Sequence, residues 1–179
     1  MNICVFGASS DAISKEYLDK ARKFGETIAS RGHSLVFGGG ATGVMGAAVR
    51  GVKSNPNGHA LGIAPRYFDT EGILYKECDE FIFTDTMRER ISLLIENSGA
   101  FAVLPGGVGT YQEFFEVFVL SQVGEIKKPI AVFNVDGCYD ELYKLLTVTA
   151  DRGFMPKHNL ELCAFFDNAD DMMNYLERG

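Results

Sequence analysis

The chain has 179 residues, enough for a sizeable core, and we expect one domain over residues 1–179. Hydrophobic residues make up 46% and charged residues 23% of the chain, as in ordinary water-soluble globular proteins. The net charge of −7, without any basic stripe, argues against nucleic acids and anionic membrane surfaces as partners.

The amino-terminal segment MNICVFGASS lacks the basic region of a signal peptide, and no stretch approaches the roughly 20 apolar residues of a membrane helix. Four cysteines are scattered along the chain without a CxxC pair, which favours buried thiols over disulfides or metal ligands. We therefore expect a cytoplasmic protein. The cysteines are Cys4, Cys78, Cys138 and Cys163.

Short apolar runs alternate with longer amphipathic segments. Strands are expected at residues 2–8, 33–39 and 59–65, the first two followed by helices at 14–31 and 43–53 and the third by an irregular stretch. Further strands are expected at 79–85, 100–107 and 129–135, followed by helices at 86–97, 110–123 and 139–152. A short apolar run at 161–166 and a helix-like segment at 168–178 close the chain.

This alternation predicts an α/β fold with three layers, in which helices cover both faces of a mostly parallel sheet. Such sheets bind ligands beyond the carboxyl ends of their strands. Polar and glycine-rich segments follow the expected strands, so they should meet at one edge of the sheet. Ser9, Ser10 and Asp11 follow the first strand and would contact a base or ribose, or form only a turn into the helix.

Two glycine-rich turns stand out. FGGGATGVMG at 37–46 contains GxGxxG after a strand and before a helix, where backbone amides can approach an anion. No acidic residue follows at the spacing of a dinucleotide site, so an NAD-type interpretation is weak and a purely structural turn stays open. PGGVGT at 105–110 is the second such turn, and two of them favour a phosphate site more than either alone.

Two segments fit the capping box of a helix start. In TYQE, Thr110 would cap the helix and Glu113 would reach back to it, which is at least as good an interpretation as catalysis. TMRE, from Thr86 to Glu89, is the second candidate. Arg88 and Arg90 fall in the first turn of that helix, the unfavourable end for a cation, which suggests an anionic partner or surface salt bridges.

PGGVGTYQE and GGGATGVMG resemble two signature turns of the LONELY GUY-type phosphoribohydrolases, long described as lysine decarboxylase-like proteins. The segment MRERI falls where that family shows Met-His-x-Arg-Lys. The resemblance covers nearly the whole chain. It implies a Rossmann-like fold, usually dimeric, and hydrolysis of the N-glycosidic bond of AMP or its N6-substituted forms, without a cofactor or metal.

The resemblance also implies which residues form the site. The catalytic pair falls on Arg90 and Glu113. Arg88 and Ile91 stand where the family has His and Lys, so the preference for an N6 group is not fixed by the resemblance. The phosphate-binding turns of the family fall on Gly39, Gly40, Thr42 and Gly43, and on Gly106, Gly107, Gly109 and Thr110. Together with Ser9, Ser10 and Met87, these residues are the expected substrate-binding set.

Glycosidic cleavage builds positive charge on the ribose, and a fixed carboxylate at Glu113 would stabilise it or orient a water. The main alternative is a binding protein of the same fold that holds a nucleotide or a phosphate-bearing cofactor, as molybdenum cofactor carriers do. An NADP-linked oxidoreductase would rest on Arg66. Lys127 and Lys128 precede a strand, at the wrong edge for a pyridoxal phosphate enzyme, and the three histidines have no metal-ligand spacing.

The expected helix at 110–123 is apolar nearly all round, which indicates burial on more than one side. A central helix would satisfy this pattern, but we favour a two-fold dimer interface with the active site close to it.

Overall fold

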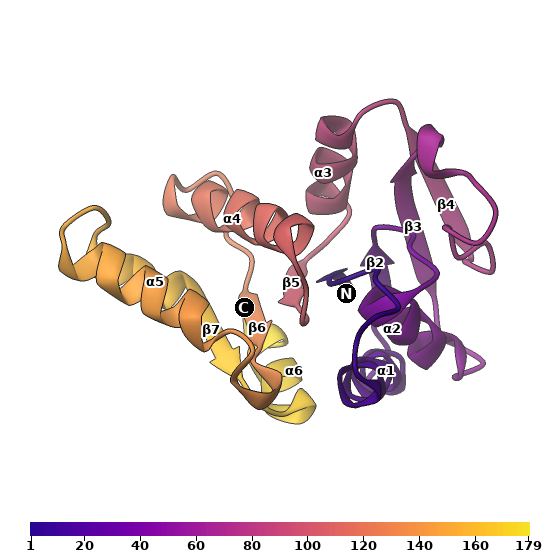
Figure 1. The fold of residues 1–179 in the computed structure, drawn as a ribbon, viewed down its shortest axis with the longest axis horizontal. Helices are drawn as coiled ribbons and strands as arrows, with labels where there is room; N and C mark the ends of the chain where they lie inside the picture. Colours follow the sequence, from indigo (N-terminus) through magenta and orange to yellow (C-terminus); the bar gives the residue numbers. More distant parts are fainter.

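A computed structural model describes all residues 1–179, and it has seven parallel strands in one sheet (Figure 1). The strand order is β4-β3-β2-β1-β5-β6-β7. Strands β2, β3 and β4 are therefore added in turn on one side of β1. The chain then crosses to the other side of β1, where β5, β6 and β7 are added in turn. The strands are β1 (Asn2–Phe6), β2 (Ser34–Phe37), β3 (Ala60–Pro65), β4 (Glu80–Thr84), β5 (Ala100–Val103), β6 (Ile130–Phe133) and β7 (Cys163–Phe166).

Helices cover both faces of the sheet, three on each side (Figure 1). The side chains of β1 show the two faces directly, because Ile3 and Val5 pack into one core cluster and Cys4 and Phe6 into the other. The first face carries α1 (Lys15–Ser30), α2 (Gly43–Lys53) and α6 (Ala169–Leu176), and the second carries α3 (Met87–Glu96), α4 (Val108–Gln122) and α5 (Asp140–Asp151). The predicted three-layer α/β fold with a parallel sheet is confirmed.

Helices α1 and α2 pack closely on the first face, at two glycines. A Cβ atom at Gly25 would overlap the carbonyl oxygen of Ala48, and one at Gly51 would overlap that of Arg22. The backbones of the two helices therefore touch, which only hydrogen as a side chain permits.

The connection from β3 to β4 contains only a short 3₁₀ turn, Arg66–Phe68. It is attached to the turn after β2 by an isolated antiparallel bridge between Gly40 and Leu74. The Ala41 amide donates to the Ile73 carbonyl at 2.8 Å, and the Tyr75 amide donates to the Gly39 carbonyl at 2.8 Å. This irregular segment thus lies over the carboxyl edge of the sheet.

At the opposite edge, charged side chains fasten α6 to the end of α1. Arg31 donates to Asp170 at 2.8 Å and to Glu177 at 3.0 Å, and His33 Nε2 lies 2.8 Å from Glu177. The contacts of His33 and Arg31 with Glu177 lower the pKa of its carboxyl group. The hydrogen bond with His33 has the largest effect, and the charge of Arg31 comes next.

One predicted helix start is wrong. Helix α4 begins at Val108 with Gly107 as its N-cap, two residues before the predicted start at 110. Thr110 therefore lies inside the first turn and does not cap the helix, and Glu113 does not reach back to it. The other predicted cap is confirmed, because the Thr86 hydroxyl accepts the Glu89 amide at 3.1 Å.

Candidate active site

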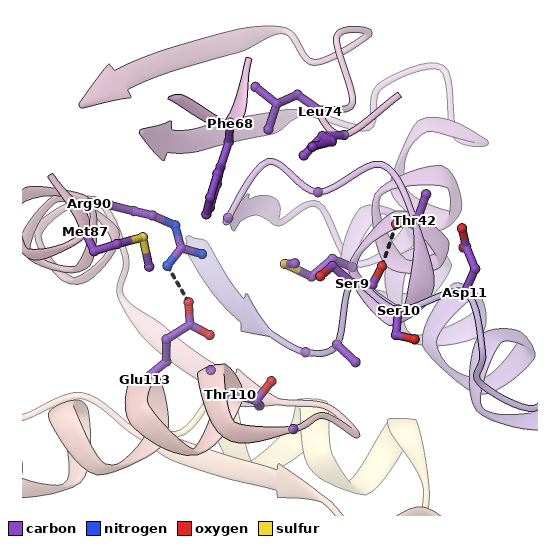
Figure 2. Close-up of a pocket in the computed structure, with 18 of the residues that line it drawn as sticks. Ser9, Ser10, Asp11, Thr42, Phe68, Leu74, Met87, Arg90, Thr110 and Glu113 are labelled. Carbon is purple, nitrogen blue, oxygen red and sulfur yellow. Dashed lines mark hydrogen bonds and ion pairs between the residues drawn. The ribbon is translucent and has the colours of Figure 1, made fainter. Parts of the chain in front are cut away.

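A cavity of about 800 Å³ opens at the carboxyl edge of the sheet (Figure 2). It lies beside the point where the strand order reverses, between β1 and β5. Open parallel sheets bind their ligands at such reversal points. Six segments line it: the turns after β1 and β2, the β3–β4 connection, the first turns of α2 and α3, and the first two turns of α4.

A buried ion pair lies in one wall of the cavity (Figure 2). Arg90 Nη1 of α3 lies 2.7 Å from Glu113 Oε1 of α4, and the two residues are only 5% and 6% exposed. Arg90 Nε also donates to the carbonyl oxygen of Ile63 in β3 at 3.3 Å. The anionic partner expected for Arg90 is therefore present within the chain, whereas Arg88 is exposed.

Gly38 makes room for this pair. A Cβ atom at position 38 would overlap Nη2 of Arg90, so only the absence of a side chain at Gly38 leaves room for the guanidinium. Close approach of a charged group to backbone is a common reason for glycine at a strand end.

Burial and charge act in opposite directions on Glu113. Desolvation raises the pKa of its carboxyl group, and the charge and hydrogen bond of Arg90 partly oppose this rise. The pKa of Glu113 is raised overall. A carboxylate with a raised pKa beside a fixed cation is a common arrangement in active sites.

The start of α4 faces the cavity without a cap. No side chain bonds to its first turn, no acidic residue lies there, and Gly107, Gly109 and Thr110 line the cavity. The Thr110 hydroxyl points into the cavity (Figure 2). The first amides of a helix are unpaired and carry a partial positive charge, so this end is suited to an anion.

The start of α2 is different, because the protein itself supplies an anion there. The Gly43 amide donates to Asp11 Oδ1 at 3.4 Å, and the Thr42 hydroxyl donates to the Ser9 carbonyl. Gly43 has φ +61°, and a Cβ atom there would meet the carbonyl oxygens of Ala8 and Ser10.

The apolar part of the cavity comes mainly from the β3–β4 connection. Phe68 and Ile73 are 36% and 47% exposed, while Leu74 is buried, and all three line the cavity with Met87 of α3. Sequence reasoning missed this wall, because the connection has no periodicity and no recognisable motif. Glu71, Met45 and Gln112 also line the cavity and were not predicted.

The cavity collects most of the predicted site residues. Three predicted residues lie outside the lining: Gly39 and Gly43 in the first glycine turn and Gly106 in the second. Arg66 also lies outside and pairs with Asp85 at 3.7 Å. The predicted residues that do line the cavity are Ser9, Ser10, Gly40, Thr42, Met87, Arg90, Gly107, Gly109, Thr110 and Glu113.

The ionisable residues of the cavity limit its chemistry. No lysine lines it, so no side chain there can form the Schiff base of a pyridoxal phosphate enzyme. Lys128 lies before β6 and donates to the Ile95 carbonyl at 2.8 Å. No three His, Cys, Asp or Glu side chains gather where they could hold a metal ion.

None of the helices has the length and apolar composition needed to cross a lipid bilayer.

The parallel sheet, the cavity at its reversal point and the open helix start define an α/β protein whose carboxyl edge is suited to a phosphate-bearing ligand. The family model described as "Possible lysine decarboxylase" matches residues 45–176. The chain belongs to this family, which also includes LONELY GUY-type phosphoribohydrolases, as the resemblance in the glycine turns indicated.

Curated relatives match nearly the whole chain. The cytokinin riboside 5′-monophosphate phosphoribohydrolase LOG2 of Arabidopsis thaliana is 34% identical over 175 residues, which cover 98% of this chain and 82% of that protein. The probable cytokinin riboside 5′-monophosphate phosphoribohydrolase LOGL9 of Oryza sativa subsp. japonica is 33% identical, covering 98% of this chain and 77% of that protein.

Solved structures share the fold at lower identity. The molybdenum cofactor binding protein of Rippkaea orientalis has a TM-score of 0.76 at 21% identity, covering 99% of this chain and 95% of that chain. A Moco carrier protein from Chlamydomonas reinhardtii has a TM-score of 0.73 at 23% identity, with 99% and 95% covered. At such identities the likeness concerns the fold alone.

Proposed function

We propose that this protein hydrolyses the N-glycosidic bond of adenosine 5′-monophosphate or its N6-substituted forms, releasing the free base and ribose 5-phosphate. The observation that carries this proposal is the buried Arg90–Glu113 pair in the wall of a cavity that also contains an uncapped helix start. The curated relatives bear the name of this activity, at 34% and 33% identity.

The 5′-phosphate binds at the start of α4. Amides of its first turn and the Thr110 hydroxyl donate to the phosphate oxygens, and the helix dipole favours the charge. Gly107 and Gly109 leave the backbone open on the cavity side. Anchoring the phosphate fixes the ribose relative to Glu113, one turn further along the same helix.

Glu113 and Arg90 act on the ribose. As the bond between C1′ and the base nitrogen breaks, the electron pair leaves with the base and positive charge develops on the ribose. The Glu113 carboxylate stabilises that charge and orients the water whose oxygen bonds to C1′. The water loses one proton as this bond forms, and the departing base gains one, so the step balances as hydrolysis. Arg90 holds the carboxylate in place and favours its ionised form.

The base lies toward the apolar wall. Phe68 and Ile73, which are partly exposed, and the buried Leu74 offer it an apolar surface. Ser9 and Ser10, on the other side, provide polar contacts for the ribose or base (Figure 2).

The test is base release from AMP and from N6-isopentenyl-AMP by the purified protein, followed by chromatography. Glu113→Gln should reduce turnover by at least about 100-fold, because it removes the charge that acts in the transition state. Glu96→Gln, at the exposed end of α3 and outside both the cavity and the groove on α4, is the control and should turn over like the wild type.

If the wild type releases no base from either nucleotide while AMP raises its melting temperature, the protein is a nucleotide-binding protein and not a hydrolase. Equal turnover by wild type and Glu113→Gln would remove Glu113 from the mechanism.

Two further parts of the proposal concern the protein's state in the cell. A homodimer through the outer face of α4 is supported by Val119 and Val123, which are exposed, and by a shallow groove that Phe115 and Leu120 help to line. Gln112 lines both this groove and the cavity, so a partner docked here would lie close to the active site.

A cytoplasmic location is supported by the four free cysteines.

A further inference from the structure

Two helix starts face the same cavity from either side of one short segment. The Ala8 amide donates to the Pro105 carbonyl at 3.1 Å, just before the turn into α4. The Ala8 carbonyl accepts the Met45 amide of α2, also at 3.1 Å. Ala8, in the turn after β1, therefore bonds to both glycine turns. The two partially positive helix ends are thus close neighbours in the cavity wall.

Two such ends side by side would suit a ligand with two linked phosphates. Only the α4 end is open, because at the α2 end the Asp11 carboxylate accepts the Gly43 amide and the Ala8 carbonyl accepts the Met45 amide. The remaining charges of the lining do not offset Asp11. Arg90 is its only cation and is paired with Glu113, while Glu71 adds another negative charge.

We propose that Asp11 is a specificity-determining residue that limits the substrate to a single phosphoryl group. The first phosphate binds at the start of α4, and a second phosphate linked to it would face the Asp11 carboxylate at the start of α2. Repulsion between these anions, together with loss of the Gly43 contact, disfavours nucleoside diphosphates. The inference rests on the proposed function for the place of the first phosphate.

Charge, not shape, carries this selection. Asp11→Asn keeps the size of the side chain and removes its charge. One unit charge several ångströms away, at a dielectric between those of protein and water, changes affinity by about tenfold. We therefore expect the variant to gain about tenfold for a diphosphate relative to a monophosphate.

The experiment uses inorganic phosphate and pyrophosphate, which contain no glycosidic bond, so binding is measured without turnover. Calorimetry on wild type and Asp11→Asn gives the ratio of the two dissociation constants. Asp19→Asn on α1 makes the same charge change outside the cavity and should leave the ratio unchanged. In parallel, kcat/KM for base release from AMP and ADP should shift in the same direction in Asp11→Asn.

A ratio unchanged within twofold in Asp11→Asn would overturn the proposal. Equal gains for phosphate and pyrophosphate would overturn it as well, because Asp11 would then act on the first phosphate. Binding of neither anion to either protein would remove its premise. A failure of the proposed function is separate: base release from AMP would be absent even where the anion ratio shifts as expected.

Discussion

The guanidinium of Arg90 lies directly against the backbone of Gly38. No residue larger than glycine fits at position 38 while Arg90 stays paired with Glu113. Arg90 cannot simply move aside, because its Nε and Nη1 are bonded to Ile63 and Glu113. The wall of the active site thus depends on a residue that itself does no chemistry.

Gly38→Ala should therefore reduce base release by at least about tenfold while the protein stays folded, because the added methyl group displaces Arg90 from Glu113. Steady-state kinetics together with a thermal melt will check this. Gly99→Ala is the matched control, since a Cβ atom there meets nothing closer than 3.7 Å. Unchanged kcat/KM in Gly38→Ala would show that Arg90 can make way for the added methyl group and still act with Glu113, which would contradict this prediction.

The pH dependence of the reaction should report Glu113. Its pKa is raised above the ordinary 4.5, so kcat/KM should fall as pH drops through a value above 4.5, where the carboxylate becomes protonated. The folded state binds this proton more tightly than the unfolded state. Its contribution to the free energy of unfolding is therefore present below pH 4.5 and is lost as pH rises through the raised pKa.

Kinetics and denaturant titrations from about pH 3.5 to pH 8 measure both effects. Glu113→Gln should lack this contribution to the pH dependence of stability. An acid limb of kcat/KM at or below pH 4.5 would contradict the raised pKa.

Glu177→Gln should destabilise the protein by roughly 0.5–1 kcal/mol at neutral pH, because Arg31 and His33 lose a charged acceptor that is partly exposed. The pKa of Glu177 is lowered in the folded state, so its stabilisation is present above pH 4.5 and is lost as pH falls through the lowered pKa. Urea titrations at pH 7 and pH 3 measure the difference. Glu161→Gln, also exposed, is the control, and an equal effect there would refute the role of the α6 bonds.

Val119→Glu should convert the expected dimer to a monomer without changing monomer stability, because it places a charge on the exposed apolar face of α4. Sedimentation velocity at micromolar concentration is the measurement. Leu145→Glu on α5, where the side chain is equally exposed, is the matched control and should stay dimeric. A monomeric wild type would refute the interface outright.

Much of the fold could be predicted from local pattern. The helix at 43–53 matches α2 at both ends, since a glycine turn precedes it and the apolar period is clear. The start of α4 could not be placed by pattern, because the residue at its N-cap position, Gly107, has an extended backbone and no side chain that could bond to the first turn. Thr110 and Glu113 then have the spacing of a capping box without forming one.

The site was less accessible to sequence reasoning. Nothing in the spacing of Arg90 and Glu113, on different helices, predicts that they touch; the family resemblance alone paired them. The wall formed by Phe68, Ile73 and Leu74 comes from a segment held to the turn after β2 by two backbone hydrogen bonds, which sequence patterns do not encode.

The backbone contact between α1 and α2 has an effect beyond stability. Because α2 begins beside the cavity, where the Gly43 amide bonds to Asp11, any side chain larger than hydrogen at Gly25 or Gly51 would push α2 away from α1 and disturb that contact. Under the role proposed for Asp11, ligand selectivity depends on how tightly two helices pack outside the site, and substitutions that never contact the substrate would alter which substrates are accepted.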